Sequence, residues 1–260
     1  MKLLEIYQHQ ISPLHLLNTR VKTIFTLVFI LCVSLSPSGT WPAYILFLTL
    51  ILSGVTLSRL SIKLLLIRSL ISLPFVLAAL PLLFTGPEPH RQLIINDQTM
   101  MLISQPGFER FISIAIKSWL SILAAILLSS TTRFEELLSA FRKLGLPILL
   151  VAILSLMWRY LSLMVDEAQS LSRARDSRSA GQSNKGTLAW RAAVTGKMVG
   201  NLLLRSLERS ERVYAAMAAR GYSGEPLFRT SNSMSRNDYW ILAFGIIICL
   251  MILVFAKLSH

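Results

Sequence analysis

Long apolar runs are the feature that most constrains this chain, because a helix of about twenty apolar residues is what spans a bilayer. Five such runs occur, at residues 21–37, 41–58, 64–85, 111–130 and 239–257. Of the 260 residues, 53% are hydrophobic and only 15% are charged, which excludes an ordinary soluble domain. The predicted fold class is therefore all-α, a polytopic integral membrane protein with about five transmembrane helices.

Basic residues flanking the runs predict the orientation, because Lys and Arg favour the cytoplasmic side of a membrane. The chain carries 26 basic and 13 acidic residues. Basic residues gather before the first run, between the second and third, and after the fourth: Lys2, Arg20, Lys22, Arg59, Lys63, Arg68, Arg133, Arg142 and Lys143. The N-terminus, the second connection and the region after residue 130 are therefore expected inside. The connection 86–110 is then outside, where QLIIN and MMLIS predict an exposed hairpin turning at Asp97-Gln98.

A sixth apolar run covers residues 146–164. If it crossed the membrane once, residues 166–238, with twelve basic and seven acidic side chains, would lie outside. That placement contradicts the charge rule. We therefore expect this run to lie in or dip into the membrane without a net crossing, which gives five spans and an external C-terminus. Six spans with another re-entry are the alternative.

The predicted organisation has three parts: a membrane domain of four spans at 1–130, cytoplasmic and membrane-interface coupling helices at 131–238, and a final transmembrane helix at 239–260. The middle part is expected to hold three helices. The first, short and amphipathic, runs from Thr132 to about Leu144, capped by Thr131 or Thr132, with Glu135 and Glu136 in its first turn and Gly145-Pro147 after it. The second covers about 148–180 and stops at Gly181, and the third covers about Leu188 to Arg220 and stops at Gly221.

The third of these helices ends in RSLERSERVYAAMAARGY. Arg205, Arg209 and Arg212 share one helix face, Glu208 and Arg212 form an i,i+4 pair, and Glu211 lies three residues after Glu208. A solvated, salt-bridged face is the simplest interpretation. The following turns differ, because four alanines leave almost no side chain and allow another backbone to approach closely: Ala215, Ala216, Ala218 and Ala219.

Arginine follows alanine near the end of both long helices. The second helix carries Ala174-Arg175-Asp176 and the third carries Ala219-Arg220-Gly221. One terminal arginine is ordinarily explained as a partner of the helix dipole. Two such ends indicate instead a docking surface with two matched sites, because the planar guanidinium suits a carboxylate on a partner.

RSLERSERVYAAMAARGY resembles the hallmark segment of the transmembrane T component of energy-coupling factor (ECF) ABC transporters, nearest to the cobalt-type CbiQ family. The resemblance covers nearly the whole chain, including SPLHLLNTRVKTIFTLVFILCVS, LPFVLAALPLLFTGP, FEELLSAFRKLGLP and MWRYLSLMVDEAQSLSRARDSR. The chain departs from the family in two places. Asn18-Thr19 stands where Asp-Pro is frequent, and Asp176 follows Ala174-Arg175 where Ser is frequent.

The resemblance implies a site and its partners. Two crossing cytoplasmic helices dock, through their Ala-Arg motifs, into grooves on two ABC ATPase subunits that bind the ATP. The implied docking residues are Ala174, Arg175, Asp176, Ala219, Arg220 and Gly221, supported by the face of Arg205, Glu208, Arg209, Glu211 and Arg212. Residues 146–164 would contact a separate substrate-binding membrane subunit. The implied function is energy coupling in a cell-membrane importer for cobalt, or else nickel.

Several chemistries have no motif in this sequence. There is no G-x-x-x-x-G-K-[ST] phosphate loop, so we expect no ATP hydrolysis, no cofactor and no catalytic residue in this chain. No His, Asp or Cys cluster suits a cobalt or nickel ion, and Cys32 and Cys249 are expected to be small buried side chains. The resemblance assigns ion capture to the separate membrane subunit.

Two other classes of function make different demands on the sequence. A basic membrane scaffold or insertase would use its cytoplasmic helices on RNA or a ribosome and bind it in a salt-sensitive way, but we expect no nucleic-acid partner. An intramembrane enzyme needs facing ionisable groups, and the spans hold few apart from Arg68 and Lys117. Lys117 is expected to extend to the outer surface.

Overall fold

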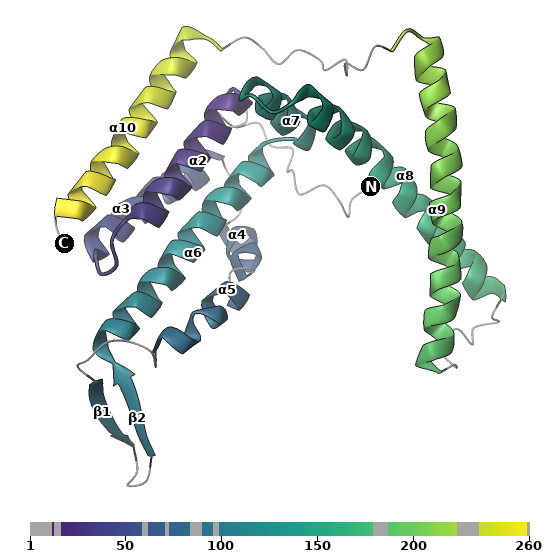
Figure 1. Ribbon diagram of the computed structural model, residues 1–260. Helices are drawn as coiled ribbons and strands as arrows, with labels where there is room; N and C mark the ends of the chain where they lie inside the picture. Colours follow the sequence, from purple (N-terminus) through teal and green to yellow (C-terminus); the bar gives the residue numbers. More distant parts are fainter. Residues whose placement is uncertain are drawn as a thin grey trace. The chain divides into compact units, whose positions relative to one another are not determined.

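The computed structural model describes residues 12, 17–58, 62–70, 73–83, 90–95, 99–178, 187–222 and 234–258. Helices dominate this part of the chain (Figure 1), and the predicted helical fold class is confirmed. In chain order the elements are α2 (Thr19–Leu35), α3 (Trp41–Ser58), α4 (Ile62–Ser69), α5 (Leu73–Ala78), the 3₁₀ helix η2 (Leu80–Leu83), β1 (His90–Ile95), β2 (Thr99–Ser104), α6 (Gln105–Thr131), α7 (Phe134–Lys143), α8 (Ile148–Arg178), α9 (Leu188–Ala219) and α10 (Arg236–Leu258).

The predicted hairpin is confirmed. β1 and β2 pair antiparallel, with His90 opposite Ser104 and Ile95 opposite Thr99. The expected turn at Asp97-Gln98 lies outside the described residues.

The chain divides into two compact units. The membrane unit comprises Ile6–Ala140 and Ser231–His260, and the helix-pair unit comprises Phe141–Thr230 together with Met1–Glu5. Their boundary lies inside α7. The predicted division by side of the membrane, at residues 130 and 238, stays a prediction.

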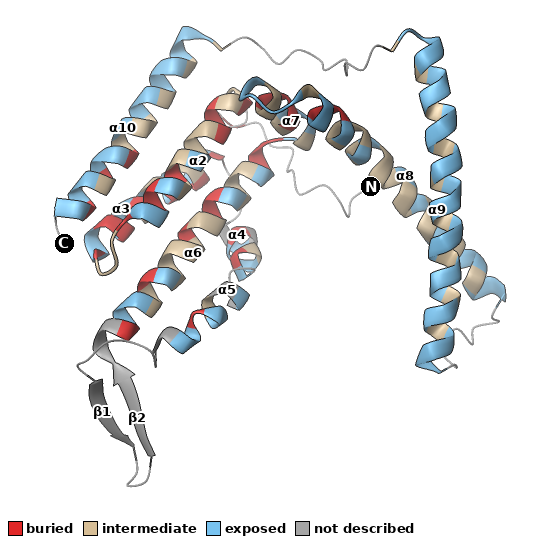
Figure 2. Ribbon diagram, in the orientation of Figure 1, coloured by how far each residue is buried: buried red, intermediate tan, exposed pale blue. Residues whose placement is uncertain are grey.

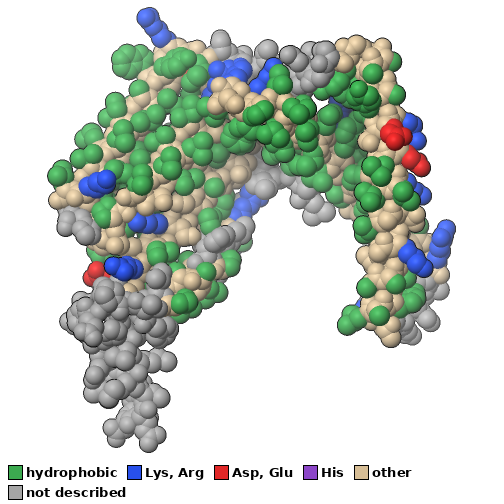
Figure 3. All heavy atoms as spheres, viewed as in Figure 1, with side chains coloured by type: hydrophobic (Ala, Val, Ile, Leu, Met, Phe, Trp, Pro, Cys, Tyr) green, Lys and Arg blue, Asp and Glu red, His purple; other side chains and the backbone are tan. Residues whose placement is uncertain are grey.

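The core of the membrane unit is made by α2, α3, α6 and α10, with a contribution from α4. Phe29 of α2 meets Phe47 of α3 edge to face, with ring centroids 5.5 Å apart, and both side chains are almost fully buried. Leu120 of α6 and Cys249 of α10 complete the same cluster, and Cys32 also lies in it. Both cysteines are buried and free, as predicted. Outside this core, hydrophobic side chains cover most of the face of these helices seen in Figure 3.

Four of the five predicted spans are single helices. The runs 41–58, 111–130 and 239–257 correspond to α3, α6 and α10. The run 21–37 corresponds to α2, which is 17 residues long and begins after Asn18, whose side chain accepts a hydrogen bond from the Arg20 amide.

The predicted third span is wrong as one continuous helix. Residues 64–85 are divided among α4, α5 and η2. Pro74 and Pro81 each stand at the second position of a short helix, because proline lacks an amide hydrogen and fits the first turn of a helix but not its interior. Side chains tie α4 to α6: the Trp119 indole donates to Ser69 Oγ at 3.0 Å and Arg68 donates to Ser130 Oγ at 3.3 Å.

In the described residues, four helices are long and apolar enough to cross a membrane: α3, α6, α8 and α10. This set includes α8, for which charge predicted no net crossing. Length and composition alone do not decide that point, so the absence of a crossing by α8 stays a prediction.

Lys117 has a partner at the end of a neighbouring helix. Its ammonium group donates to the carbonyl oxygen of Ser36, the residue that caps α2. Four residues earlier on α6, Ser113 accepts from the Gly39 amide at 3.1 Å. A cation at a helix C-terminus is electrostatically favourable, so this lysine and Ser113 hold the α2–α3 connection against α6.

A second polar group joins α2, α6 and α7. Lys22 is buried and donates to the Thr131 carbonyl at 3.3 Å, and Thr19 donates to Glu136 at 3.1 Å. The predicted cap of α7 is wrong, because Thr131 belongs to α6, where its hydroxyl bonds back to the Leu127 carbonyl at 2.8 Å. Helix α7 begins two residues after Thr132.

A glycine on α10 allows α10 and α2 to approach closely. A Cβ atom at Gly245 would lie 2.8 Å from the Phe25 ring, whereas one at Gly200 on α9 would have nothing within 4 Å. We expect Gly245→Leu to destabilise the protein by about 1–3 kcal/mol, because overpacking forces the ring and helix to shift. Thermal unfolding in detergent measures this, with Gly200→Leu as the matched control. Equal unfolding temperatures for the two variants would contradict this account of the contact.

Candidate functional site: the crossing helices α8 and α9

The two longest helices of the helix-pair unit begin and end at defined signals. Helix α7 ends at Lys143 and is followed by Gly145, whose φ of 103° suits glycine, and α8 begins at Ile148. Thr187 caps α9 by accepting a hydrogen bond from the Trp190 amide at 3.3 Å. The predicted beginnings at 148 and Leu188 are therefore confirmed. The last described residue of α8 is Arg178, and the expected stop at Gly181 lies outside the described residues.

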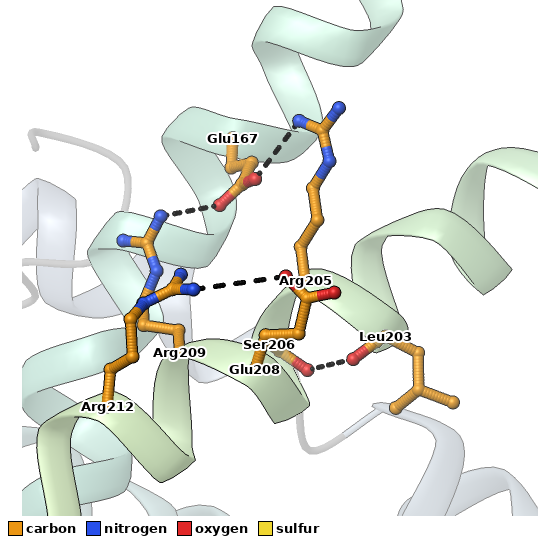
Figure 4. Close-up of polar contacts among 7 residues, drawn as sticks. All are labelled: Glu167, Leu203, Arg205, Ser206, Glu208, Arg209 and Arg212. Atoms are coloured by element: carbon orange, nitrogen blue, oxygen red, sulfur yellow. Dashed lines mark hydrogen bonds and ion pairs between the residues drawn. The ribbon is translucent and has the colours of Figure 1, made fainter. Parts of the chain in front are cut away.

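One carboxylate joins α8 to α9 where they cross (Figure 4). One carboxylate oxygen of Glu167 on α8 lies 3.4 Å from a guanidinium nitrogen of Arg205, and the other lies 3.2 Å from a guanidinium nitrogen of Arg209. The Glu167 side chain is only 16% exposed, against 58% for Arg205 and 34% for Arg209. We call these three residues the crossing clamp.

The predicted arginine face is therefore divided in two. Arg205 and Arg209 point to α8, whereas Arg212 pairs with Glu208 of its own helix at 3.9 Å, the expected i,i+4 contact, with both side chains mostly exposed. Glu211 is exposed. Sequence reasoning missed Glu167. Asp166 and Glu167 are acidic residues in the middle of α8, but the sequence alone does not show that two arginines of α9 lie opposite them.

The first Ala-Arg motif lies inside the last turns of α8. Ala174, Arg175 and Asp176 are all helical, and Arg178 follows in the same helix. The Arg175 side chain is 28% exposed and lies 3.9 Å from the Asp176 carboxylate, while Ala174 is exposed. This motif therefore presents its residues from the side of a helix.

The second Ala-Arg motif is a helix end. Arg220 caps α9, and Gly221 follows with a φ of 76°. The Tyr222 amide donates to the Met217 carbonyl and the Gly221 amide to that of Ala218, both at 3.0 Å. This is the Schellman pattern, in which a left-handed residue satisfies the last carbonyls. Ala219, Arg220 and Gly221 are exposed beyond it.

The alanine surface of α9 is not covered by α8. Ala215, Ala216, Ala218 and Ala219 are all exposed. Figure 2 shows α9 as exposed or intermediate along its whole length, and it holds no buried residue. The close approach of another backbone that these alanines permit is therefore not made by α8, and contact with a partner stays a prediction.

In Figure 1, α8 ends on the side of the crossing where α9 begins, and α9 ends on the other side of the crossing. The two Ala-Arg motifs therefore lie on different arms of the helix pair. Among the described residues, no group of three His, Cys, Asp or Glu side chains is arranged to hold a metal ion.

The chain combines a unit of long apolar helices with an exposed pair of long crossing helices, which defines a membrane protein with surface available to other subunits. Comparison with known proteins gives its family. The family model described as CbiQ, cobalt transport protein, matches residues 10–230. The chain belongs to this family, the T components of ECF transporters, which act in the cell membrane in association with other transporter subunits. The suspected family is confirmed.

Individual relatives are distant in sequence. An uncharacterized protein of Methanocaldococcus jannaschii is 27% identical over 180 aligned residues. The aligned residues cover 69% of this chain and 61% of that protein's length. The ECF transporter transmembrane protein EcfT of Leuconostoc gelidum is 26% identical over 90% of this chain and 85% of its own. The nickel permease LarQ of Lactiplantibacillus plantarum is 29% identical over 46% of this chain and 42% of its own.

The Schellman end fixes where α9 stops, and this is testable. We expect Gly221→Val to destabilise the end of α9 by about 1–2 kcal/mol, because a side chain disfavours the left-handed conformation. Hydrogen exchange of the amides of Gly221 and Tyr222 should become faster. The control is Gly196→Val, in the interior of α9 with open space around it, which should leave the exchange of these two amides unchanged. Unchanged exchange in Gly221→Val would show that the end does not depend on this glycine.

Proposed function

We propose that this chain is the non-catalytic energy-coupling subunit of an ATP-driven importer, docked to two ABC ATPase subunits through its two Ala-Arg motifs. The observation that carries the proposal is the exposed crossing pair, in which each long helix carries one motif on a different arm. Family membership gives it context, because relatives in the family are named as ECF transporter transmembrane proteins.

Arg220 is exposed and Arg175 is partly exposed, so both motifs are accessible to acidic grooves on a partner. Arg220 projects from a helix end flanked by exposed alanines, so a partner groove meets little steric resistance. Arg175 lies on the side of α8 with exposed Ala174 next to it. Each guanidinium is suited to a planar, two-point contact with a carboxylate.

Motion is proposed to pass along the helices. Helices α8 and α9 hold 31 and 32 residues, which makes each about 46–48 Å long at 1.5 Å per residue. When ATP closes the ATPase pair, the docked arginines move together with their grooves. The apolar first half of α8 then carries that displacement to a substrate-binding membrane subunit. The N-terminus and both helices are proposed to be cytoplasmic and the C-terminus external, on the charge pattern.

Cobalt, or else nickel, is the proposed substrate. The family is described by cobalt transport, and one relative is named as a nickel permease. A separate subunit is proposed to capture the ion, so this chain transmits energy without selecting the substrate.

Removal of the docking arginines tests the ATPase contact. We expect Arg175→Ala and Arg220→Ala each to weaken retention of co-expressed candidate ATPases by about a hundred-fold, and the double variant to abolish it, because each leaves a partner carboxylate buried and unpaired. Pull-down from detergent and ATP-dependent uptake in proteoliposomes measure this. Arg178→Ala and Lys197→Ala, at exposed positions of the same helices, control for charge. Full retention and coupling in the double variant would refute docking through these motifs.

Metal uptake tests the substrate. We expect cells expressing this chain with its ATPase and substrate-binding partners to accumulate radiolabelled cobalt or nickel. Accumulation should be lost when the double arginine variant replaces the wild-type chain. Competition between the two ions gives their order. Uptake of neither ion, with ATPases still bound, would remove the substrate assignment and leave the coupling role intact.

A further inference from the structure

Helices α8 and α9 meet without a buried apolar core in the described residues. Helix α9 has no buried residue, and the buried residues of α8 are Val151 and Ala152, near its beginning. Glu167 lies fifteen residues beyond Ala152, so these two do not contribute to the crossing itself. The crossing therefore depends on half-buried side chains and on the charges among them.

The half-buried side chains of α9 form one stripe along the helix. From Leu202 to the end of the helix, its members recur every three or four residues: Leu202, Ser206, Arg209, Val213 and Met217. Apolar contacts in such a stripe are repeated at each turn, so they permit one helix to slide or rotate on another. Arg209, in the middle of the stripe, adds a contact with a single partner, since its guanidinium reaches Glu167 at 3.2 Å.

The geometry of the clamp restricts both sliding and rotation. Arg205 and Arg209 are four residues apart, about 6 Å along α9, and each holds a different oxygen of Glu167. Sliding α9 along its axis in either direction lengthens one of these contacts. Rotation of α9 about its axis carries both arginines away from the carboxylate, so two contacts from one turn define a register.

The parts of α8 and α9 that extend from the clamp to the two motifs turn a small change in crossing angle into a larger displacement of the motifs. Arg175 lies eight residues beyond Glu167, about 12 Å, and Arg220 lies eleven residues beyond Arg209, about 16 Å. A change of about 10° in crossing angle therefore moves a motif by about 2–3 Å, which is enough to break a hydrogen bond between an arginine and a carboxylate.

We propose that Glu167 is a positioning residue, which sets the register and angle of the α8–α9 crossing and thereby the spacing of the two Ala-Arg motifs. This inference rests on the proposed function in one respect: the spacing of the two motifs matters because two ATPase subunits bind them and move during ATP binding. The clamp itself concerns only this chain.

Distance measurement between the arms of the isolated full chain tests the clamp. Spin labels are placed at Ser177→Cys on α8 and Ala216→Cys on α9, both exposed, after the buried Cys32 and Cys249 are replaced by alanine. We expect a narrow distance distribution with Glu167 present and a broad one in Glu167→Gln, which keeps the shape of the side chain and removes its charge. Asp166→Asn, an exposed neighbouring carboxylate, is the matched control and should leave the distribution narrow.

A charge exchange separates ion pairing from general packing. Glu167→Arg alone places three arginines together and should broaden the distribution further. Adding Arg209→Glu restores a pair across the helices and should narrow it again. An unchanged distribution in Glu167→Gln, or failure of the exchange to narrow it, would overturn the proposal. Glu167→Gln alone decides the matter if Glu167→Arg does not fold.

Coupling is measured in the assembled transporter. We expect Glu167→Gln to retain its ATPases, because both docking arginines remain, while metal uptake per ATP hydrolysed falls by about ten-fold. Normal uptake despite a broad distribution would overturn the link between crossing and coupling. A failure of the proposed function is distinguishable, since ATPases would then be retained without Arg175 and Arg220 whatever the spin labels report.

Discussion

Backbone hydrogen bonding in a medium without water is the constraint on which the membrane unit depends. Lipid offers no partner to an exposed amide or carbonyl, so the chain must satisfy each one internally, and a helix does so within one segment. Helices α2, α3, α6 and α10 follow this rule and pack around Phe29 and Phe47. At the end of α2, where no further helical turn supplies a backbone amide, a side chain donates the hydrogen bond instead: Lys117 donates to the Ser36 carbonyl. Lys117, which lies within the apolar run 111–130, thus finds its polar partner at a helix end.

The helix-pair unit follows a different logic. Its two long helices bury little surface between them, and α9 is exposed or intermediate throughout. A surface that is not buried within the chain is available to other chains, which agrees with a family whose members work together with other transporter subunits. The crossing then needs a specific contact in place of a core. A partly desolvated carboxylate shared by two arginines supplies such a contact, because ion pairs with two oxygens are directional and apolar packing alone is not.

Apolar length and helix-end residues made much of this fold predictable. The limits of α3 and α10 follow from their apolar runs, and those of α9 from Thr187 and Gly221. Hydropathy failed at residues 64–85, because a proline at the start of a short helix leaves the local apolar content unchanged while dividing the span. Glu167 was missed because its partners stand 38 and 42 residues away in the sequence. Local spacing describes one helix face and says nothing of which residue lies opposite.

The two Ala-Arg motifs looked equivalent in sequence and differ in structure. Ala174-Arg175-Asp176 is part of a continuing helix, and its arginine is partly covered and lies near Asp176. Ala219-Arg220-Gly221 ends a helix, and its arginine is exposed beyond a left-handed glycine. The difference follows from the third residue of each motif, because aspartate continues a helix where glycine allows the chain to leave it. A groove that accepts a helix end does not automatically accept the side of a helix. The two proposed docking contacts therefore differ in geometry, since one presents a helix end and the other the side of a helix.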